Sequence, residues 1–79
     1  MYKLGIIGYT GMVGMELTRL IQEEINGGAP LEIVYTKNSK GEAGTLSKCD
    51  LVFLATKDRE SMENAEAVLA AGCKVVDMS

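Results

Sequence analysis

The fold of this chain is decided by the stretch Leu4-Gly5-Ile6-Ile7-Gly8-Tyr9-Thr10-Gly11-Met12-Val13-Gly14. A short apolar run, typical of a β-strand, leads here into a turn of the pattern G-x-x-G-x-x-G. Beyond the turn, apolar residues recur at helical spacing, at Val13, Leu17, Leu20, Ile21 and Ile25. A strand, a glycine turn and a helix in this order form the phosphate-binding element of dinucleotide-binding folds. The alternative is an ordinary tight turn that binds nothing.

The three glycines of the turn have different expected roles. Gly8 lets the chain leave the strand through backbone dihedrals that a Cβ would forbid. Gly11 lies where the backbone must approach a pyrophosphate closely. Gly14 lies inside the helix, where close packing against the strand would offset the low helix propensity of glycine. Because the N-terminus of the helix would face the phosphates, the expected cofactor contacts are Gly8, Tyr9, Thr10, Gly11, Met12, Val13 and Gly14.

Length and composition indicate one small domain, residues 1–79, of ordinary globular character. The net charge of −3, with no cluster of Lys or Arg, argues against a nucleic-acid partner. No apolar run approaches the roughly 18 residues of a membrane span. Only Met1, Tyr2 and Lys3 precede the first apolar run, so no signal peptide is expected. Cys49 and Cys73, with no histidine in the chain, form no metal pattern. We expect reduced thiols and a cytoplasmic location.

Hydrophobic patterning predicts four strands and two helices in alternation. The expected strands are residues 3–8, 31–35, 51–55 and 74–77, and the expected helices are residues 12–26 and 58–71. Residues 37–44 are predicted to be a flexible connection, followed by loop or one short turn. The pattern predicts an α/β, Rossmann-like fold, with a parallel sheet in the order second, first, third, fourth strand and helices on both faces. Because no helix follows the fourth strand, we expect a fragment of a larger enzyme.

Ligands of such sheets collect at the carboxyl ends of the strands. This edge would bring the glycine turn together with Thr36 and Lys37 after the second strand, and with Ala55 and Thr56 after the third. The two cysteines precede the third and fourth strands, and would lie at the opposite edge. Neither is therefore a good candidate for a catalytic thiol.

The end of the second strand indicates which cofactor is bound. An NAD-selective site usually has Asp or Glu there, to hold the ribose 2′-hydroxyl. Residues 35–40 contain no acid. Lys37 or Lys40 could neutralise a 2′-phosphate while Thr36 or Ser39 donates a hydrogen bond. This favours NADP over NAD, the alternative being that these residues form a solvated loop.

Several segments resemble the semialdehyde-dehydrogenase superfamily, which includes N-acetyl-gamma-glutamyl-phosphate reductase and aspartate-semialdehyde dehydrogenase. The glycine turn with Met15-Glu16-Leu17 resembles the opening of these enzymes. Two segments look most like the reductase, namely residues 50–56, Asp-Leu-Val-Phe-Leu-Ala-Thr, and residues 70–79, Ala-Ala-Gly-Cys-Lys-Val-Val-Asp-Met-Ser. Members of that family typically read VFLA in the first and VIDLS in the second. Aspartate-semialdehyde dehydrogenases more often read DNSS at the end of the second segment, and Asp77-Met78-Ser79 does not match that pattern.

The resemblance implies the NADP-binding part of a reductase that converts N-acetyl-gamma-glutamyl phosphate to the semialdehyde in arginine biosynthesis. In that family a cysteine attacks the acyl phosphate, and hydride then reduces the thioester. The family's catalytic cysteine and histidine lie beyond this segment, so no catalytic residue is assigned and the 79 residues alone are expected to be inactive. The full-length enzyme is expected to be a homo-oligomer that binds a small-molecule dinucleotide.

Two departures from the family and three alternatives remain. The connection between Tyr35 and Cys49 is shorter than usual, and Lys57-Asp58 stands where many relatives have histidine. The chain could instead be the same segment of aspartate-semialdehyde dehydrogenase, or a stand-alone nucleotide-binding module without catalysis. A sugar-nucleotide epimerase shares the glycine pattern, but would be expected to carry a Tyr-x-x-x-Lys pair, which this sequence lacks.

Overall fold

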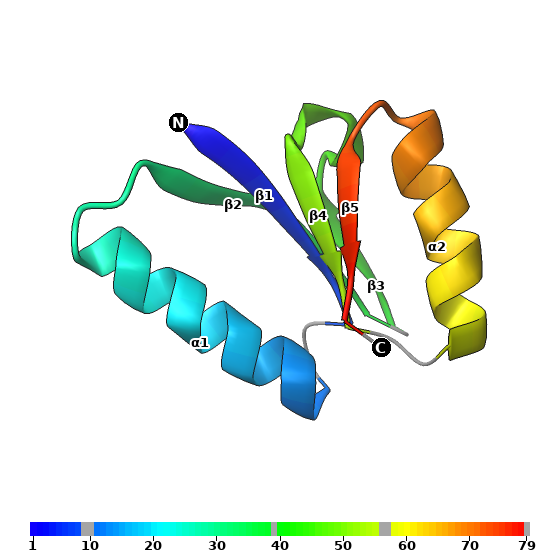
Figure 1. Cartoon of the computed structure of the whole chain (residues 1–79), viewed down its shortest axis with the longest axis horizontal. Helices are drawn as coiled ribbons and strands as arrows, with labels where there is room; N and C mark the ends of the chain where they lie inside the picture. Colours follow the sequence, from blue (N-terminus) through cyan, green and yellow to red (C-terminus); the bar gives the residue numbers. More distant parts are fainter. Residues whose placement is uncertain (9–10, 39, 56–57, 79) are drawn as a thin grey trace.

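One sheet forms the centre of the molecule, with a helix on each of its faces (Figure 1). The computed structural model describes residues 1–8, 11–38, 40–55 and 58–78, and in the second helix it describes side chains from residue 64 onward. The strands are β1 (Tyr2–Ile7), β2 (Leu31–Asn38), β3 (Gly41–Gly44), β4 (Leu51–Leu54) and β5 (Lys74–Asp77). The helices are α1 (Met12–Asn26) and α2 (Asp58–Ala70), and a 3-10 turn, η1, covers Leu46–Lys48.

The order of the strands, β3-β2-β1-β4-β5, contains the order predicted from the sequence. Strands β2, β1, β4 and β5 are mutually parallel, and α1 and α2 lie on opposite faces (Figure 1). From β1 the chain passes through α1 to β2 on one side, and later reaches β4 on the other side. The ends of β1 and β4 therefore form a topological switch point, which is where ligands bind in open α/β sheets.

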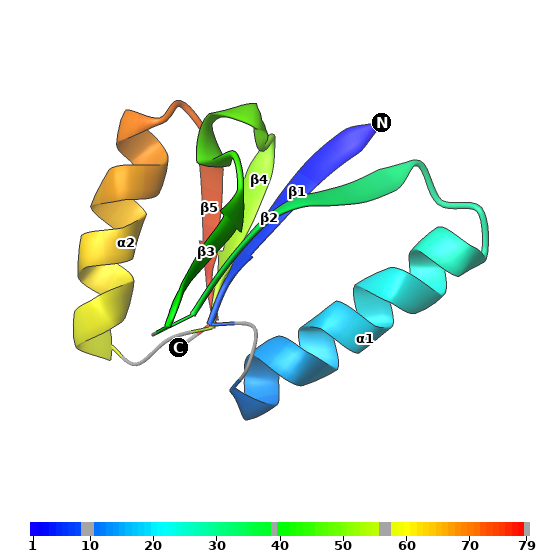
Figure 2. The same ribbon diagram turned by 180° about the vertical axis from the view of Figure 1, so that it is seen from behind.

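The prediction for residues 37–44 was wrong, because this segment completes β2 and adds a fifth strand. Strand β3 pairs antiparallel with β2, with Asn38 opposite Gly41 and Tyr35 opposite Gly44. Figure 2 shows β3 alongside β2, and in the order of the strands β3 and β5 are the two edge strands. The side-chain oxygen of Asn38 accepts hydrogen bonds from the backbone N–H groups of Lys40 and Gly41, at 2.9 and 3.1 Å. Asparagine and glycine are thus turn residues of a tight hairpin here, where their composition had indicated a linker.

A β-bulge interrupts the pairing of β1 with β2. Leu4 pairs with Ile33 and Gly5 pairs with Tyr35, so that Val34 is the extra residue. As a result, Ile33 packs on the α1 face of the sheet while both Val34 and Tyr35 pack on the α2 face. The carbonyl oxygen of Val34 accepts a hydrogen bond from the N–H of Thr45, at 3.3 Å. The bulge therefore ties β2 to the end of β3.

The centre of the sheet is buried on both faces, and each face has its own apolar cluster. Towards α1, Leu4 and Ile6 of β1 pack with Ile21 of the helix. Towards α2, Ile7, Val52, Leu54 and Val68 form the centre of the second cluster, together with Tyr35, Cys49 and Cys73. Alternate residues of the short, wholly apolar strand β4 serve the two clusters, which is typical of a central parallel strand.

Gly5 lies in the core, where the structure leaves no room for a larger residue. A Cβ at this position would lie 2.9 Å from Sγ of Cys49 and 3.2 Å from Cγ2 of Val52. We expect Gly5→Ala to reduce the free energy of unfolding by about 1–3 kcal/mol, as overpacking does. Replacing Cys49 with Ala as well removes the closest atom, so the double variant should be more stable than the two single effects predict. Urea unfolding of all four proteins measures this coupling, and strict additivity would contradict the contact.

Candidate cofactor-binding site

The carboxyl ends of three strands are joined at the start of the glycine turn. Gly8, which has a φ of 88°, donates its N–H to the carbonyl of Lys37 at the end of β2, at 2.7 Å. Ala55, directly after β4, donates its N–H to the carbonyl of Ile7, at 2.8 Å. The predicted contacts Gly8, Lys37 and Ala55 thus lie together at the switch point, and the positive φ explains why the first glycine is needed.

The N-terminus of α1 opens towards this point without a capping side chain. Gly11 is the N-cap residue, makes no side-chain hydrogen bond, and no acidic residue occupies the first turn. A Cβ on Gly11 would lie 3.6 Å from the carbonyl oxygen of Gly8 and 4.0 Å from that of Ala55. Gly14 is buried one turn further along. The first backbone N–H groups of a helix have no partner within the helix and attract anions, and Gly11 leaves room beside them.

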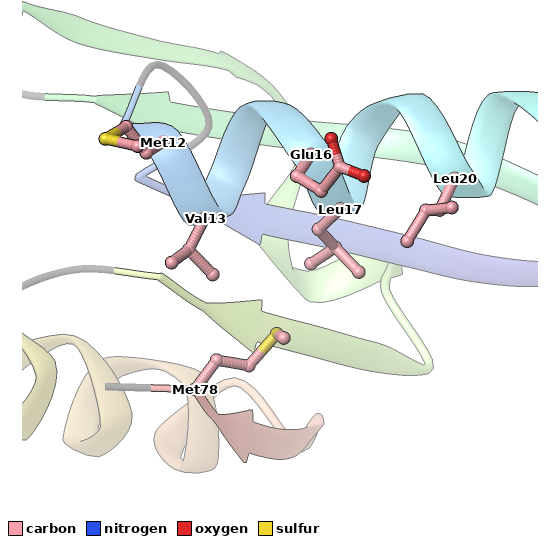
Figure 3. Close-up of a pocket in the computed structure, with 6 residues that line it drawn as sticks. All are labelled: Met12, Val13, Glu16, Leu17, Leu20 and Met78. Atoms are coloured by element: carbon pink, nitrogen blue, oxygen red, sulfur yellow. The ribbon is translucent and has the colours of Figure 1, made fainter.

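Met12 and Val13 also belong to the predicted contacts, but their side chains point elsewhere. They line an apolar groove of about 320 Å³ along α1, together with Glu16, Leu17, Leu20 and Met78. In Figure 3, Val13 and Leu17 point from α1 towards the sulfur-bearing side chain of Met78. The side chain of Met12 is 91 % exposed. A cofactor at the turn would therefore meet the backbone of these two residues, as the binding of phosphate to a helix N-terminus requires.

On the other side of the turn, the β2–β3 hairpin forms a polar groove of about 350 Å³. It is lined by Thr36, Asn38, Lys40, Gly41, Glu42 and Ala43. Thr36 and Lys40 were candidates from the sequence, whereas Asn38, Glu42 and Ala43 were missed because the hairpin was not predicted. Four other predicted contacts, Tyr9, Thr10, Ser39 and Thr56, lie outside the described residues.

Lys37 does not share the hairpin groove with Thr36, because adjacent residues of a strand point to opposite faces. Its Nζ donates a hydrogen bond to Oδ1 of Asn64 in α2, at 3.2 Å. Asn64 was not identified from the sequence, since nothing in a single sequence links two residues 27 positions apart. Lys37 and Thr36 therefore border the end of β2 from its two faces.

The acid opposite Lys37 is engaged by another residue. Glu42 pairs with Lys37 across the hairpin, yet its carboxylate accepts a hydrogen bond from the hydroxyl of Tyr35. Burial raises the pKa of the Tyr35 hydroxyl well above its usual value, and the Glu42 carboxylate raises it further. Tyr35 therefore remains a protonated donor at neutral pH. Within the described residues, Lys37 forms no ion pair with a carboxylate.

Both cysteines lie at the amino edge of the sheet, away from the glycine turn. Cys49 and Cys73 directly precede β4 and β5 by one or two residues, and both are buried free thiols. Burial, together with the nearby Cys73, raises the pKa of Cys49 to about 11. Because the thiolate is the reactive form, Cys49 is a poor nucleophile at neutral pH.

The described residues contain no cluster of three or more His, Cys, Asp or Glu side chains that could hold a metal ion. Neither described helix is long and apolar enough to cross a membrane.

Comparison with known proteins agrees with this geometry. Residues 28–79 match the family described as semialdehyde dehydrogenase, NAD binding domain. The N-acetyl-gamma-glutamyl-phosphate reductase of Halorhodospira halophila is 35% identical over 102 residues, covering 99% of this chain and 28% of the relative. That of Thiobacillus denitrificans is 33% identical over 99 residues, covering 100% of this chain and 29% of the relative.

A solved structure shows the same architecture. The probable aspartate-semialdehyde dehydrogenase from Pseudomonas aeruginosa superposes with a TM-score of 0.77 and 25% sequence identity, over 98% of this chain and 28% of that one. The chain therefore belongs to the NAD-binding domain family of the semialdehyde dehydrogenases. It spans less than a third of the length of these relatives.

These findings confirm the resemblance and the fold class predicted from the sequence. The family match begins after the glycine turn, whereas the alignments to the reductases include the turn, because they cover 99–100% of the chain. The alignment of 102 positions is longer than the 79 residues of the chain. The relative thus has positions without a counterpart here.

Proposed function

We propose that this chain binds NADP at the carboxyl edge of its sheet, as the cofactor-binding part of a reductase. The observation that carries the proposal is the space at Gly11, which lies at the switch point between two backbone carbonyls and beside an uncapped helix N-terminus. A Cβ would fill this space, and the free backbone N–H groups of the helix N-terminus beside it would attract the negative charge of a pyrophosphate. The residues present therefore suit a dinucleotide.

The end of β2 supports NADP in preference to NAD. Thr36, Asn38 and Lys40 line the hairpin groove, and Lys37 lies on the other face of the same strand end. No acid is present in β2 after Glu32 to accept a ribose 2′-hydroxyl. A 2′-phosphate would find a hydroxyl donor in Thr36 and a cation in Lys37 or Lys40, with Ser39 and Thr56 as further proposed contacts.

The substrate is inferred from the relatives. We propose conversion of N-acetyl-gamma-glutamyl phosphate to N-acetylglutamate semialdehyde, because the alignments that cover 99–100% of this chain are to proteins named N-acetyl-gamma-glutamyl-phosphate reductase. NADPH would supply the hydride, and the chain's own role is to bind and orient it. A cysteine and a histidine from outside these residues would act on the acyl group, in a cytoplasmic homo-oligomer. Aspartate semialdehyde is the second candidate, since the structural neighbour is titled a probable aspartate-semialdehyde dehydrogenase.

Titration with NADPH and NADH tests the cofactor assignment. We expect NADPH to bind with a Kd in the micromolar range or weaker, because a large part of a dinucleotide's usual contact surface lies outside this chain. NADH should bind about tenfold more weakly, since it lacks the charge-assisted hydrogen bonds of the 2′-phosphate. Calorimetry or the fluorescence of the reduced nicotinamide reports both constants. Equal affinities would contradict the choice of NADP, and absence of binding would contradict the site.

A further inference from the structure

Two neighbouring hydrogen bonds at the β2–β3 hairpin keep a lysine and a glutamate apart. Lys37 and Glu42 are direct partners across the antiparallel pair. In such pairs the Cβ atoms lie about 4.5–5.5 Å apart, and opposite charges attract each other. Here, however, Lys37 contacts the neutral amide of Asn64, and Glu42 accepts the hydroxyl of Tyr35. The expected ion pair is replaced by two hydrogen bonds with neutral partners.

Among the side chains that the structure describes, no carboxylate forms an ion pair with Lys37. An ammonium group has three donor hydrogens, and Asn64 uses one of them. Tyr35 is 3 % exposed, so packing fixes its ring and the position of its hydroxyl. It therefore holds the Glu42 carboxylate at little entropic cost, and Glu42 forms no ion pair with Lys37.

Lys37 lies beside the glycine turn, where its positive charge could attract an anionic group of a cofactor. Its carbonyl accepts the N–H of Gly8, so that this residue borders the glycine turn at the carboxyl edge. Its side chain reaches to α2, across the face of the sheet opposite to Thr36. An anionic group at the end of β2 would be within reach of the two remaining ammonium hydrogens.

We propose that Tyr35 and Asn64 are positioning residues that keep Lys37 from pairing with Glu42, so that Lys37 recognises the 2′-phosphate of the cofactor. Asn64 holds the ammonium group in place, while Tyr35 prevents Glu42 from neutralising it. This inference rests on the proposed binding of NADP, and it selects Lys37 over Lys40 as the phosphate-binding cation.

The test compares 2′,5′-ADP with 5′-AMP, because these two nucleotides differ only in the 2′-phosphate. We expect Tyr35→Phe to weaken the binding of 2′,5′-ADP about fivefold to tenfold, in line with the loss of a charge-assisted contact, without a change for 5′-AMP. The ring still packs, while Glu42 becomes free to pair with Lys37. Adding Glu42→Gln to this variant should restore the affinity, and Asn64→Asp should lower it because the new carboxylate neutralises Lys37.

Calorimetry or NMR titration gives the affinities, and unfolding midpoints show that each variant is folded. The inference fails if Tyr35→Phe has no effect, or if Glu42→Gln does not rescue it. It also fails if Lys40→Gln removes the preference for 2′,5′-ADP and Lys37→Gln does not, which would place the phosphate in the hairpin groove. If the unmodified chain itself does not prefer 2′,5′-ADP, the proposal of NADP fails first, and this inference with it.

Discussion

Gly44→Ala should reduce the free energy of unfolding by about 3–5 kcal/mol, since it adds both backbone strain and overpacking. The φ of Gly44 is 88°, and a Cβ there would lie 1.9 Å from the carbonyl oxygen of Val34. Neither backbone can give way easily, because the same carbonyl accepts the N–H of Thr45. We therefore expect the β2–β3 hairpin to separate, and the midpoint of thermal unfolding to fall.

Gly72 provides a matched control for this substitution. Its φ is 82°, close to that of Gly44, but no atom lies within 4 Å of a Cβ built there. Gly72→Ala should therefore cost only the conformational strain, of the order of 1 kcal/mol. The difference between the two variants in urea unfolding isolates the clash with Val34. If the two substitutions reduced the free energy of unfolding equally, the close contact between position 44 and the carbonyl oxygen of Val34 would be contradicted.

Gly11→Val should abolish measurable NADPH binding, a loss of about a hundredfold or more if a side chain occupies the place of the pyrophosphate. The fold should survive, because the φ of Gly11 is −75° and a Cβ there makes only ordinary contacts with the carbonyls of Gly8 and Ala55. We expect a stability change of less than about 1 kcal/mol, from the poorer N-cap residue.

The same substitution at the other end of α1 is the control. Gly27 has a φ of −81°, and its Cβ would lie 3.5 Å from each of two backbone carbonyls, those of Glu23 and Glu24. Gly27→Val should therefore leave the affinity for NADPH unchanged. Nicotinamide fluorescence and thermal unfolding, measured for both variants, separate binding from folding. Retained NADPH binding in Gly11→Val would contradict the phosphate site.

The sequence predicted those parts of the molecule that depend on local patterns. The bounds of α1 and the order of the parallel strands follow from apolar spacing and from the right-handed crossover rule. The need for glycine at position 8 followed from the turn it opens. The family, too, was predicted from short segments, at residues 8–17, 50–56 and 70–79.

The parts that depend on pairing between distant or irregular segments were not predicted. Asn38 and Gly41 were interpreted as linker residues, although as turn residues they place Glu42 opposite Lys37. The hydrogen bond between Tyr35 and Glu42 could not be predicted without the hairpin, because it depends on the register of β2 and β3. The contact of Lys37 with Asn64 joins two elements whose relative position is set only by the packed sheet.

Because of the bulge at Val34, the number of residues in β2 determines which side chains lie on each face at the end of this strand. One extra residue in β2 moves Tyr35 and Lys37 to the face of α2, although Leu31 and Ile33 face α1. If this strand lacked the extra residue, the residues after it would keep their order in the sequence but would point to the opposite face of the sheet. Between homologues that differ by a gap in this strand, contacts must therefore be transferred by the face on which a residue lies. Beyond such a gap, a residue that is identical in the two aligned sequences lies on opposite faces of the sheet in the two proteins, and its contacts differ.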